Sequence, residues 1–284
     1  MRIDAHQHFW RYNPARDGWI TDEMAVLKKD FLPVHLVPEL VANDMQGCIA
    51  VQADQSEAET QFLLDLAERH KLIQGVVGWV DLCADNVTER LEVLSKYSKL
   101  CGFRHLVQAE PDDRFMLRPA FLRGIRSLEE FGFTYDILIY ARQLPAAREL
   151  VSRFPSQLFV IDHIAKPSIK NKLLVPWSHD LCAVAEYPNV YCKVSGLVTE
   201  AEWHRWTLDN FKPYLDTVFT AFGVDRLMFG SDWPVCLPAA GYRQVVELVT
   251  EYMHDLPQAD VEKVFGLNAT HFYGQRASQH AVAI

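Results

Sequence analysis

Two histidines stand one residue apart near the beginning of the chain, in the stretch "DAHQHFW". In an extended strand, side chains two positions apart share a face. Asp4, His6 and His8 are therefore expected on one face of this stretch. Ile3 and Ala5 are expected on the other face. Two imidazoles on one face can bind a cation or exchange a proton, but a single His-x-His also occurs by chance.

Ionisable and polar side chains also stand at the ends of later apolar runs. They are Arg104, His105, Tyr140, Asp162, His163, Lys166, Lys193, Ser195, Asp232 and Trp233. Taken singly, a histidine near a loop or an aspartate before a turn has an ordinary structural role. Three histidines and one carboxylate together form a set that one divalent cation accepts, and without a metal the same set is an acid–base cluster. The four residues are His6, His8, His163 and Asp232.

The elements that must position these residues follow a repeated pattern. Eight short β-rich apolar runs, at 2–9, 47–54, 73–82, 101–107, 133–140, 158–165, 190–196 and 226–234, predict strands. Helical periodicity lies between most of them, at 56–71, 86–97, 121–132 and 239–256. This alternation predicts one (β/α)8 TIM barrel over residues 1–284, with a frayed tail at about 276–284. A doubly wound open sheet is the alternative, although no glycine fingerprint for dinucleotides follows the first run.

Two local patterns refine this prediction. Ser56 followed by Glu59 three residues later predicts a capping box at the start of a helix. Residues 13–33 read as a long loop after the first strand, and we expect this loop to cover the mouth of the barrel.

Composition excludes several classes of protein. A formal charge of −9 and a pI near 5.6 disfavour a surface for nucleic acid or anionic membranes. No apolar run approaches the roughly 20 residues that span a bilayer. The chain begins without a basic-then-apolar leader, so we interpret the protein as cytoplasmic. Its six cysteines are scattered without a Cys-x-x-Cys pair, as expected of reduced, mostly buried thiols.

In (β/α)8 barrels, chemistry takes place at the carboxyl ends of the strands, where the polar residues are predicted here. A His-x-His in the first strand, a histidine ending the sixth and an aspartate ending the eighth resemble the amidohydrolase superfamily. The words "DAHQHFW", "GFRH", "DHIAKP", "CKVSGLVTEA" and "RLMFGSDWPVC" are similar to its sugar-lactonase branch, of the L-fuconolactonase and L-rhamnonolactonase type. The resemblance runs from residue 2 to about residue 273.

The resemblance implies hydrolysis of aldonolactones to aldonic acids. His6, His8, His163 and Asp232 would form the catalytic centre, and the resemblance places Arg104 and His105 beside the lactone. Two-metal members of the superfamily carry a bridging lysine or glutamate on strand four and a histidine on strand five, and both are missing here. The resemblance therefore implies at most one divalent ion, zinc first, held by the four central residues. Relatives in this branch can do without it.

Opening a lactone requires a base toward water, a group that stabilises the oxyanion and a proton for the leaving alkoxide. We expect Asp232 to be the base, with the cationic and donor groups around it offsetting the negative charge. A polyhydroxylated ring also needs polar partners and an aromatic platform. The candidates for substrate binding are Gln7, Arg104, Lys193, Ser195, Trp10, Trp19, Tyr140 and Trp233. Resemblance to the branch favours a 6-deoxy-hexono-lactone.

Three alternatives remain open at this stage. Related barrels include metal-dependent non-oxidative decarboxylases, which need no activated water. They also include hydrolases of pyrone dicarboxylates, which should need several arginines near the mouth for two carboxylates. A sugar- or metal-binding barrel without catalysis is the third. A homodimer is the default expectation for the assembly.

Overall fold

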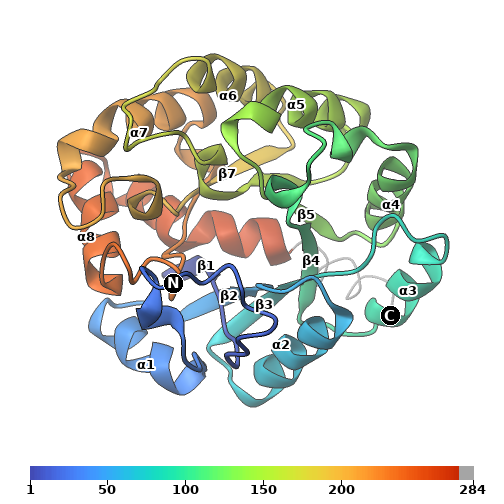
Figure 1. Ribbon diagram of the computed structural model, residues 1–284. Helices are drawn as coiled ribbons and strands as arrows, with labels where there is room; N and C mark the ends of the chain where they lie inside the picture. Colours follow the sequence, from blue (N-terminus) through green and yellow to red (C-terminus); the bar gives the residue numbers. More distant parts are fainter. Residues whose placement is uncertain (275–284) are drawn as a thin grey trace.

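Eight parallel strands follow one another around a barrel, in the order in which they occur in the chain (Figure 1). The computed structural model describes residues 1–274, so the tail predicted at about 276–284 lies outside the described residues. The strands are β1 (Ile3–Gln7), β2 (Gly47–Val51), β3 (Ile73–Gly78), β4 (Leu100–His105), β5 (Thr134–Ile137), β6 (Phe159–Ile161), β7 (Val190–Val194) and β8 (Leu227–Phe229). Beyond β8, the Asp232 N–H donates to the His6 carbonyl at 2.8 Å and joins the last strand to the first. The predicted (β/α)8 barrel is confirmed.

Helices surround the strands and connect them (Figure 1). They are α1 (Pro33–Ala42), α2 (Glu57–Arg69), α3 (Val87–Leu94), α4 (Pro119–Glu130), α5 (Leu144–Arg153), α6 (Trp177–Ala185), α7 (Leu208–Phe222), α8 (Tyr242–Tyr252) and α9 (Gln258–Glu262). Each of the four segments with helical periodicity overlaps one of them, namely α2, α3, α4 or α8. No helix within residues 1–274 has the length and apolar character that crossing a bilayer demands.

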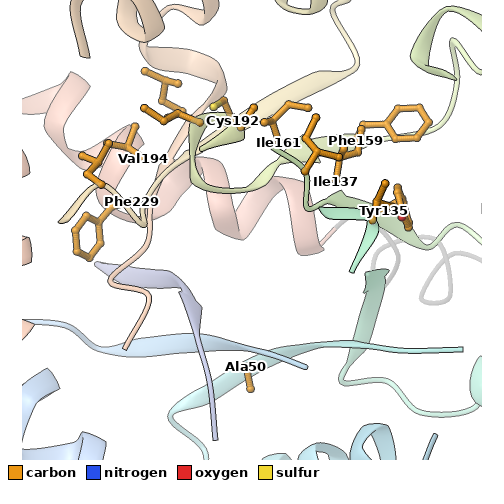
Figure 2. Packing of buried hydrophobic residues seen from close by; sticks show 14 of the residues in the cluster. Ala50, Tyr135, Ile137, Phe159, Ile161, Cys192, Val194 and Phe229 are labelled. Carbon is orange, nitrogen blue, oxygen red and sulfur yellow. The ribbon is translucent and has the colours of Figure 1, made fainter. Parts of the chain in front are cut away.

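The outward faces of the strands carry the larger apolar cluster, which packs against the helices. Figure 2 shows pairs of this cluster two positions apart on one strand, such as Tyr135 with Ile137 on β5 and Cys192 with Val194 on β7. The residues between the members of these pairs, Asp136 and Lys193, must face the barrel interior. These two strands therefore direct charged side chains into the barrel, although most of their residues are apolar.

A second, smaller apolar cluster fills one end of the barrel interior. It joins residues of β1, β2, β3, β4, β6 and β8 to three residues of the last helical turns, Ala269, Phe272 and Tyr273. Figure 1 shows this C-terminal helical segment, in red, crossing the barrel. The segment closes the end opposite the strand ends that carry the polar residues.

Ile3 shares a face with Ala5, and His6 shares one with His8, as predicted. The grouping of Asp4 with the histidines and the separation of the two pairs are wrong, because β1 contains a register shift between Asp4 and Gln7. Ala5 lies in the interior apolar cluster, and His6 also faces the interior, with its Nδ1 3.1 Å from the Lys193 ammonium. Asp4 points outward and accepts a hydrogen bond from the Tyr242 hydroxyl of α8 at 3.0 Å. The same carboxylate accepts the His6 N–H at 3.1 Å, which diverts that group from the regular ladder.

Helix α2 begins with half of the predicted capping box. The Ser56 hydroxyl accepts the Glu59 N–H at 3.2 Å, as predicted. The Glu59 carboxylate turns to the end of β2, where it accepts the N–H groups of Ala53 at 2.6 Å and Asp54 at 3.1 Å. Glu59 therefore fixes the loop after β2 instead of closing the box, and it is 5% exposed.

Burial raises the pKa of Glu59 from 4.5 to about 7. The folded state therefore holds this proton over a pH range in which the unfolded state has released it. Between about pH 4.5 and pH 7 the contribution of Glu59 to the free energy of unfolding falls as pH rises, by up to about 3 kcal/mol. In Glu59→Gln, urea unfolding should show a shallower loss of stability across this range than in the wild type. Glu68→Gln, an exposed position of the same helix, is the control and should follow the wild-type curve.

Candidate active site

Three imidazoles and one carboxylate meet at the carboxyl ends of β1, β6 and β8. The Nε2 atoms of His6 and His8 lie 3.2 Å apart, and Oδ1 of Asp232 lies 3.3 Å from the His8 Nε2. The same Oδ1 lies 3.9 Å from the His6 Nε2 and 3.8 Å from the His163 Nε2. All four side chains are buried. The structure thus brings together the four residues that the sequence analysis placed at the centre.

Unusual backbone conformations aim two of these side chains into the centre. Four consecutive residues after β6, numbers 163–166, have φ between 47° and 60°, which is the left-handed region. Asp232 also has a positive φ of 57°. Left-handed conformations cost free energy in residues other than glycine and persist where the surrounding structure enforces them. The His163 Nδ1 is held by the Ser195 hydroxyl at 2.9 Å, so contacts from β7 fix the direction of its Nε2.

Gly196 leaves room for the His163 ring. It has a φ of +63°, and an added Cβ would lie 2.6 Å from the His163 Nδ1. We expect Gly196→Ala to push the imidazole away from Asp232 and to strain the backbone, lowering kcat/KM at least about tenfold and stability by about 1–3 kcal/mol. Activity assays and urea unfolding measure the two effects. Gly223→Ala is the control, because its φ is +64° but no atom lies within 4 Å of the added Cβ. It should lose stability alone.

Hydrogen bonds on the far sides of the imidazoles decide which nitrogen atoms present lone pairs. The His8 Nδ1 lies 2.7 Å from the Val51 carbonyl, which can only accept, so Nδ1 carries the proton and Nε2 the lone pair. The Arg104 guanidinium can only donate and lies 3.2 Å from the His6 Nε2. The His6 Nδ1 lies between the Lys193 ammonium at 3.1 Å and the Asp162 carboxylate at 3.3 Å. Two lone pairs therefore face each other beside a carboxylate, and a cation stabilises such an arrangement.

The distances in this group suit a single metal ion. Tetrahedral zinc binds nitrogen at about 2.0–2.1 Å, so two of its ligand atoms lie roughly 3.3 Å apart. The separations of 3.2 Å between the two Nε2 atoms and 3.3 Å between the His8 Nε2 and Asp232 match this value. His6, His8 and Asp232 therefore form a ligand set that fits a divalent cation, with His163 beside it.

Charge and burial set the protonation states of the centre. Burial lowers the pKa of both His6 and His163 well below 6.5, so both are neutral at pH 7. Burial alone would raise the pKa of Asp232, but His163 and His8 hold it below its usual 3.8. His6 and His163 are thus neutral and Asp232 is ionised, which are the forms needed by metal ligands and by a base.

A buried network of four charges lies directly beneath the centre. The Lys193 ammonium contacts Asp136 at 2.5 Å and Asp162 at 3.0 Å, and Arg104 contacts Asp162 at 2.9 Å. Burial alone would raise the pKa of Asp162, but Lys193, His6 and Arg104 hold it well below its usual value. Lys193 and Arg104, predicted to bind substrate, therefore act first as partners of buried carboxylates and of His6.

Asp136 and Asp162 were not among the predicted site residues. Asp136 alternates with Tyr135 and Ile137, whose side chains face the helices. This alternation in "FTYDILIY" was the signal that an aspartate faces the interior. Asp162 directly precedes His163 and was visible at the end of its strand. Only the structure shows that both aspartates neutralise Lys193.

His105 lies away from the centre. Its ring stacks on Phe115 at 4.9 Å between centroids, and its Nε2 lies 2.7 Å from Glu110. Because Arg104 faces the interior, the next residue of the strand must face the other way. His105 therefore lies outside the group formed by His6, His8, His163 and Asp232, and its position beside the lactone stays a prediction.

Other predicted substrate-binding side chains are also directed elsewhere. The Gln7 amide donates to the Cys48 sulfur at 3.3 Å on the outer face of the barrel. Trp233 is buried with its ring 5.1 Å from that of Phe31, between centroids, in the loop after β1. The exposed Trp19 packs edge-on against Trp10, which is itself buried. Of the predicted aromatic platforms, Tyr140 stands at the rim, with the Lys166 ammonium 5.6 Å from its ring centroid.

Comparisons with known proteins identify the family. The amidohydrolase family profile matches residues 3–275. An L-fucono-1,5-lactonase of Burkholderia multivorans is 42% identical to this chain and is covered over 96% of both chains. An L-fucono-1,5-lactonase of Burkholderia ambifaria is 36% identical over 96% of this chain and 95% of its own. A crystal structure of an amidohydrolase from Burkholderia multivorans with bound zinc has a TM-score of 0.92 at 41% identity, and the match covers 96% of this chain and 99% of that one. The chain therefore belongs to the amidohydrolase family, in the sugar-lactonase branch that its motifs resemble.

Proposed function

We propose that the protein hydrolyses a sugar lactone to the aldonic acid and that Asp232 is the base toward water. The observation that carries this proposal is the position of the Asp232 carboxylate, 3.3–3.9 Å from three imidazole nitrogens in a buried centre at the carboxyl ends of the strands. The L-fucono-1,5-lactonase relatives support a 6-deoxy-hexono-lactone as the substrate. L-Fucono- and L-rhamnono-lactone are the first candidates.

The side chains of the centre divide the work of ester hydrolysis. Asp232 is ionised near neutral pH and takes a proton from the attacking water. A cation held by the centre would offset the negative charge that develops on the carbonyl oxygen. Asp232 then returns its proton to the ring oxygen, which leaves as an alcohol. His105 has no part in this sequence of steps.

A divalent cation would add Lewis acidity at this position. We propose zinc, held by His6, His8 and Asp232, because imidazole and carboxylate ligands at these separations suit it. The hydrogen bond from the His8 Nδ1 to the Val51 carbonyl holds the ring in the tautomer that binds a metal through Nε2. The neutral state of His6 serves the same purpose.

The charges of the pocket favour a sugar lactone over the alternatives. A pyrone dicarboxylate would need free cationic groups for two carboxylates. Arg104 is committed to Asp162, to His6 and to the Gln52 carbonyl. Lys193 is committed to two aspartates. A decarboxylase would not need a base placed toward water, whereas Asp232 is held in its ionised form.

A panel of aldonolactones with a pH indicator tests the proposal. We expect acid release from 6-deoxy-hexono-lactones, measured before and after treatment with a chelator and after zinc is restored. Loss of activity on chelation, with recovery on zinc addition, would support the cation. Unchanged activity would retain the lactonase and remove the cation. If no lactone is opened and none raises the melting temperature, the proposed substrate class is wrong.

A further inference from the structure

A second lysine–carboxylate pair lies at the rim of the pocket. Lys166 ends the left-handed turn after β6, and Glu200 lies in the loop after β7. The Lys166 Nζ and the Glu200 Oε1 are 3.8 Å apart, with 17% and 24% of the two side chains exposed. The pair therefore connects two loops of the mouth, and solvent reaches it only in part.

Both members of the pair have unused hydrogen-bonding capacity. A direct N–H···O bond spans about 2.7–3.2 Å, so the separation of 3.8 Å is an ion pair without a closed hydrogen bond. Among residues 1–274, no group hydrogen-bonds the Glu200 carboxylate or accepts from the Lys166 ammonium. Partly buried charges of this kind are unfavourable unless a ligand supplies the missing partners.

The pair also lies beside the catalytic centre. Lys166 ends the same left-handed turn, 163–166, that directs His163 into the centre. Glu200 lies in the loop that follows Ser195, whose hydroxyl holds the His163 Nδ1 at 2.9 Å. Both members of the pair therefore belong to loops that carry or hold a residue of the centre.

We propose that Lys166 and Glu200 bind neighbouring hydroxyl groups of the sugar lactone and thereby select polyhydroxylated rings. This inference rests on the proposed function. A hydroxyl group both donates and accepts, so one hydroxyl of a diol accepts from the ammonium while its neighbour donates to the carboxylate. A diol gives both the ammonium and the carboxylate a hydrogen-bond partner. A ring without hydroxyl groups gives a partner to neither. The Tyr140 ring, beside Lys166, supplies an apolar surface for the C–H face of the same sugar.

The experiment compares a 6-deoxy-hexono-1,5-lactone with δ-valerolactone, which has the same ring without hydroxyl groups. Lys166→Met and Glu200→Gln are each expected to lower kcat/KM for the sugar lactone about 10- to 100-fold, mainly through KM. Hydrolysis of δ-valerolactone should stay within about twofold of the wild type. The double variant should lose about as much as either single variant, because both residues bind the same diol.

A neighbouring pair provides a matched control. Lys170 and Glu202 join the same two loops at 3.1 Å, but 58% and 54% of their side chains are exposed. Lys170→Met and Glu202→Gln should leave both substrates unaffected. Equal losses on both lactones, or wild-type kinetics on the sugar lactone, would overturn the role of Lys166 and Glu200 alone. A wild-type protein that opens no sugar lactone would instead overturn the proposed function and this inference with it.

Discussion

Asp232→Asn is expected to lower kcat/KM for lactone opening by about 10²- to 10⁴-fold. The amide has nearly the same volume but cannot take a proton from water, so the chemical step loses its base. Asparagine also tolerates the left-handed backbone that Asp232 adopts, with a φ of 57°. The fold should therefore survive, and the loss should appear in kcat more than in KM.

Indicator assays on the purified variant measure this loss, and a melting curve checks the fold. Asp225→Asn is the matched control, because Asp225 precedes the same strand but its side chain is 76% exposed. Binding of the aldonic acid, followed by calorimetry, should largely persist in Asp232→Asn. Lactone opening within threefold of the wild type would assign the base to another residue. Loss of both hydrolysis and binding would point to a ligand-binding role instead.

Much of the fold could be predicted because each strand and helix is encoded locally. Short β-rich runs and helical stripes alternate, and a parallel barrel follows from that order. The catalytic centre could be predicted in the same way, because the carboxyl ends of all strands in such a barrel lie at one rim. His6 lies in β1, and His163 and Asp232 directly follow β6 and β8, although the three residues are far apart in sequence.

What could not be predicted depends on contacts between distant residues. The shift in β1 depends on Asp4, whose carboxylate accepts the hydroxyl of Ser231, 227 positions away. The local pattern of "RIDAHQHF" therefore cannot reveal this hydrogen bond to Ser231. The orientation of His105 is different, because strand alternation already places neighbouring residues such as Arg104 and His105 on opposite faces.

The burial of Lys193 also depends on residues that are distant in the sequence. Lys193 was predicted to bind substrate, because burying a single ammonium without a partner is very costly. It is fully buried here because Asp136 and Asp162 both contact it. Tyr273, from the segment that closes the barrel, donates its hydroxyl to Asp136 at 2.8 Å. The charges beneath the centre are thus supported by side chains from both ends of the barrel.

Lys193→Met should consequently be among the most destabilising single changes in the protein. It leaves the two aspartates with no ammonium partner in a fully buried site, and breaking a buried ion pair in this way costs about 3–5 kcal/mol. Urea unfolding followed by circular dichroism measures the loss. Lys212→Met is the control, since Lys212 pairs with Asp209 at 2.7 Å but is 51% exposed, and its stability should stay close to that of the wild type.

A second substitution separates the loss of charge balance from the loss of packing. Asp136→Asn removes one of the carboxylates left unpaired by Lys193→Met, while its amide oxygen can still accept from Tyr273. The double variant should therefore be more stable than Lys193→Met alone, since neighbouring residues of one ion network do not contribute additively. If the two losses simply add, packing of the lysine stem accounts for the effect. In that case the buried charges beneath His6 are not what stabilises this part of the barrel.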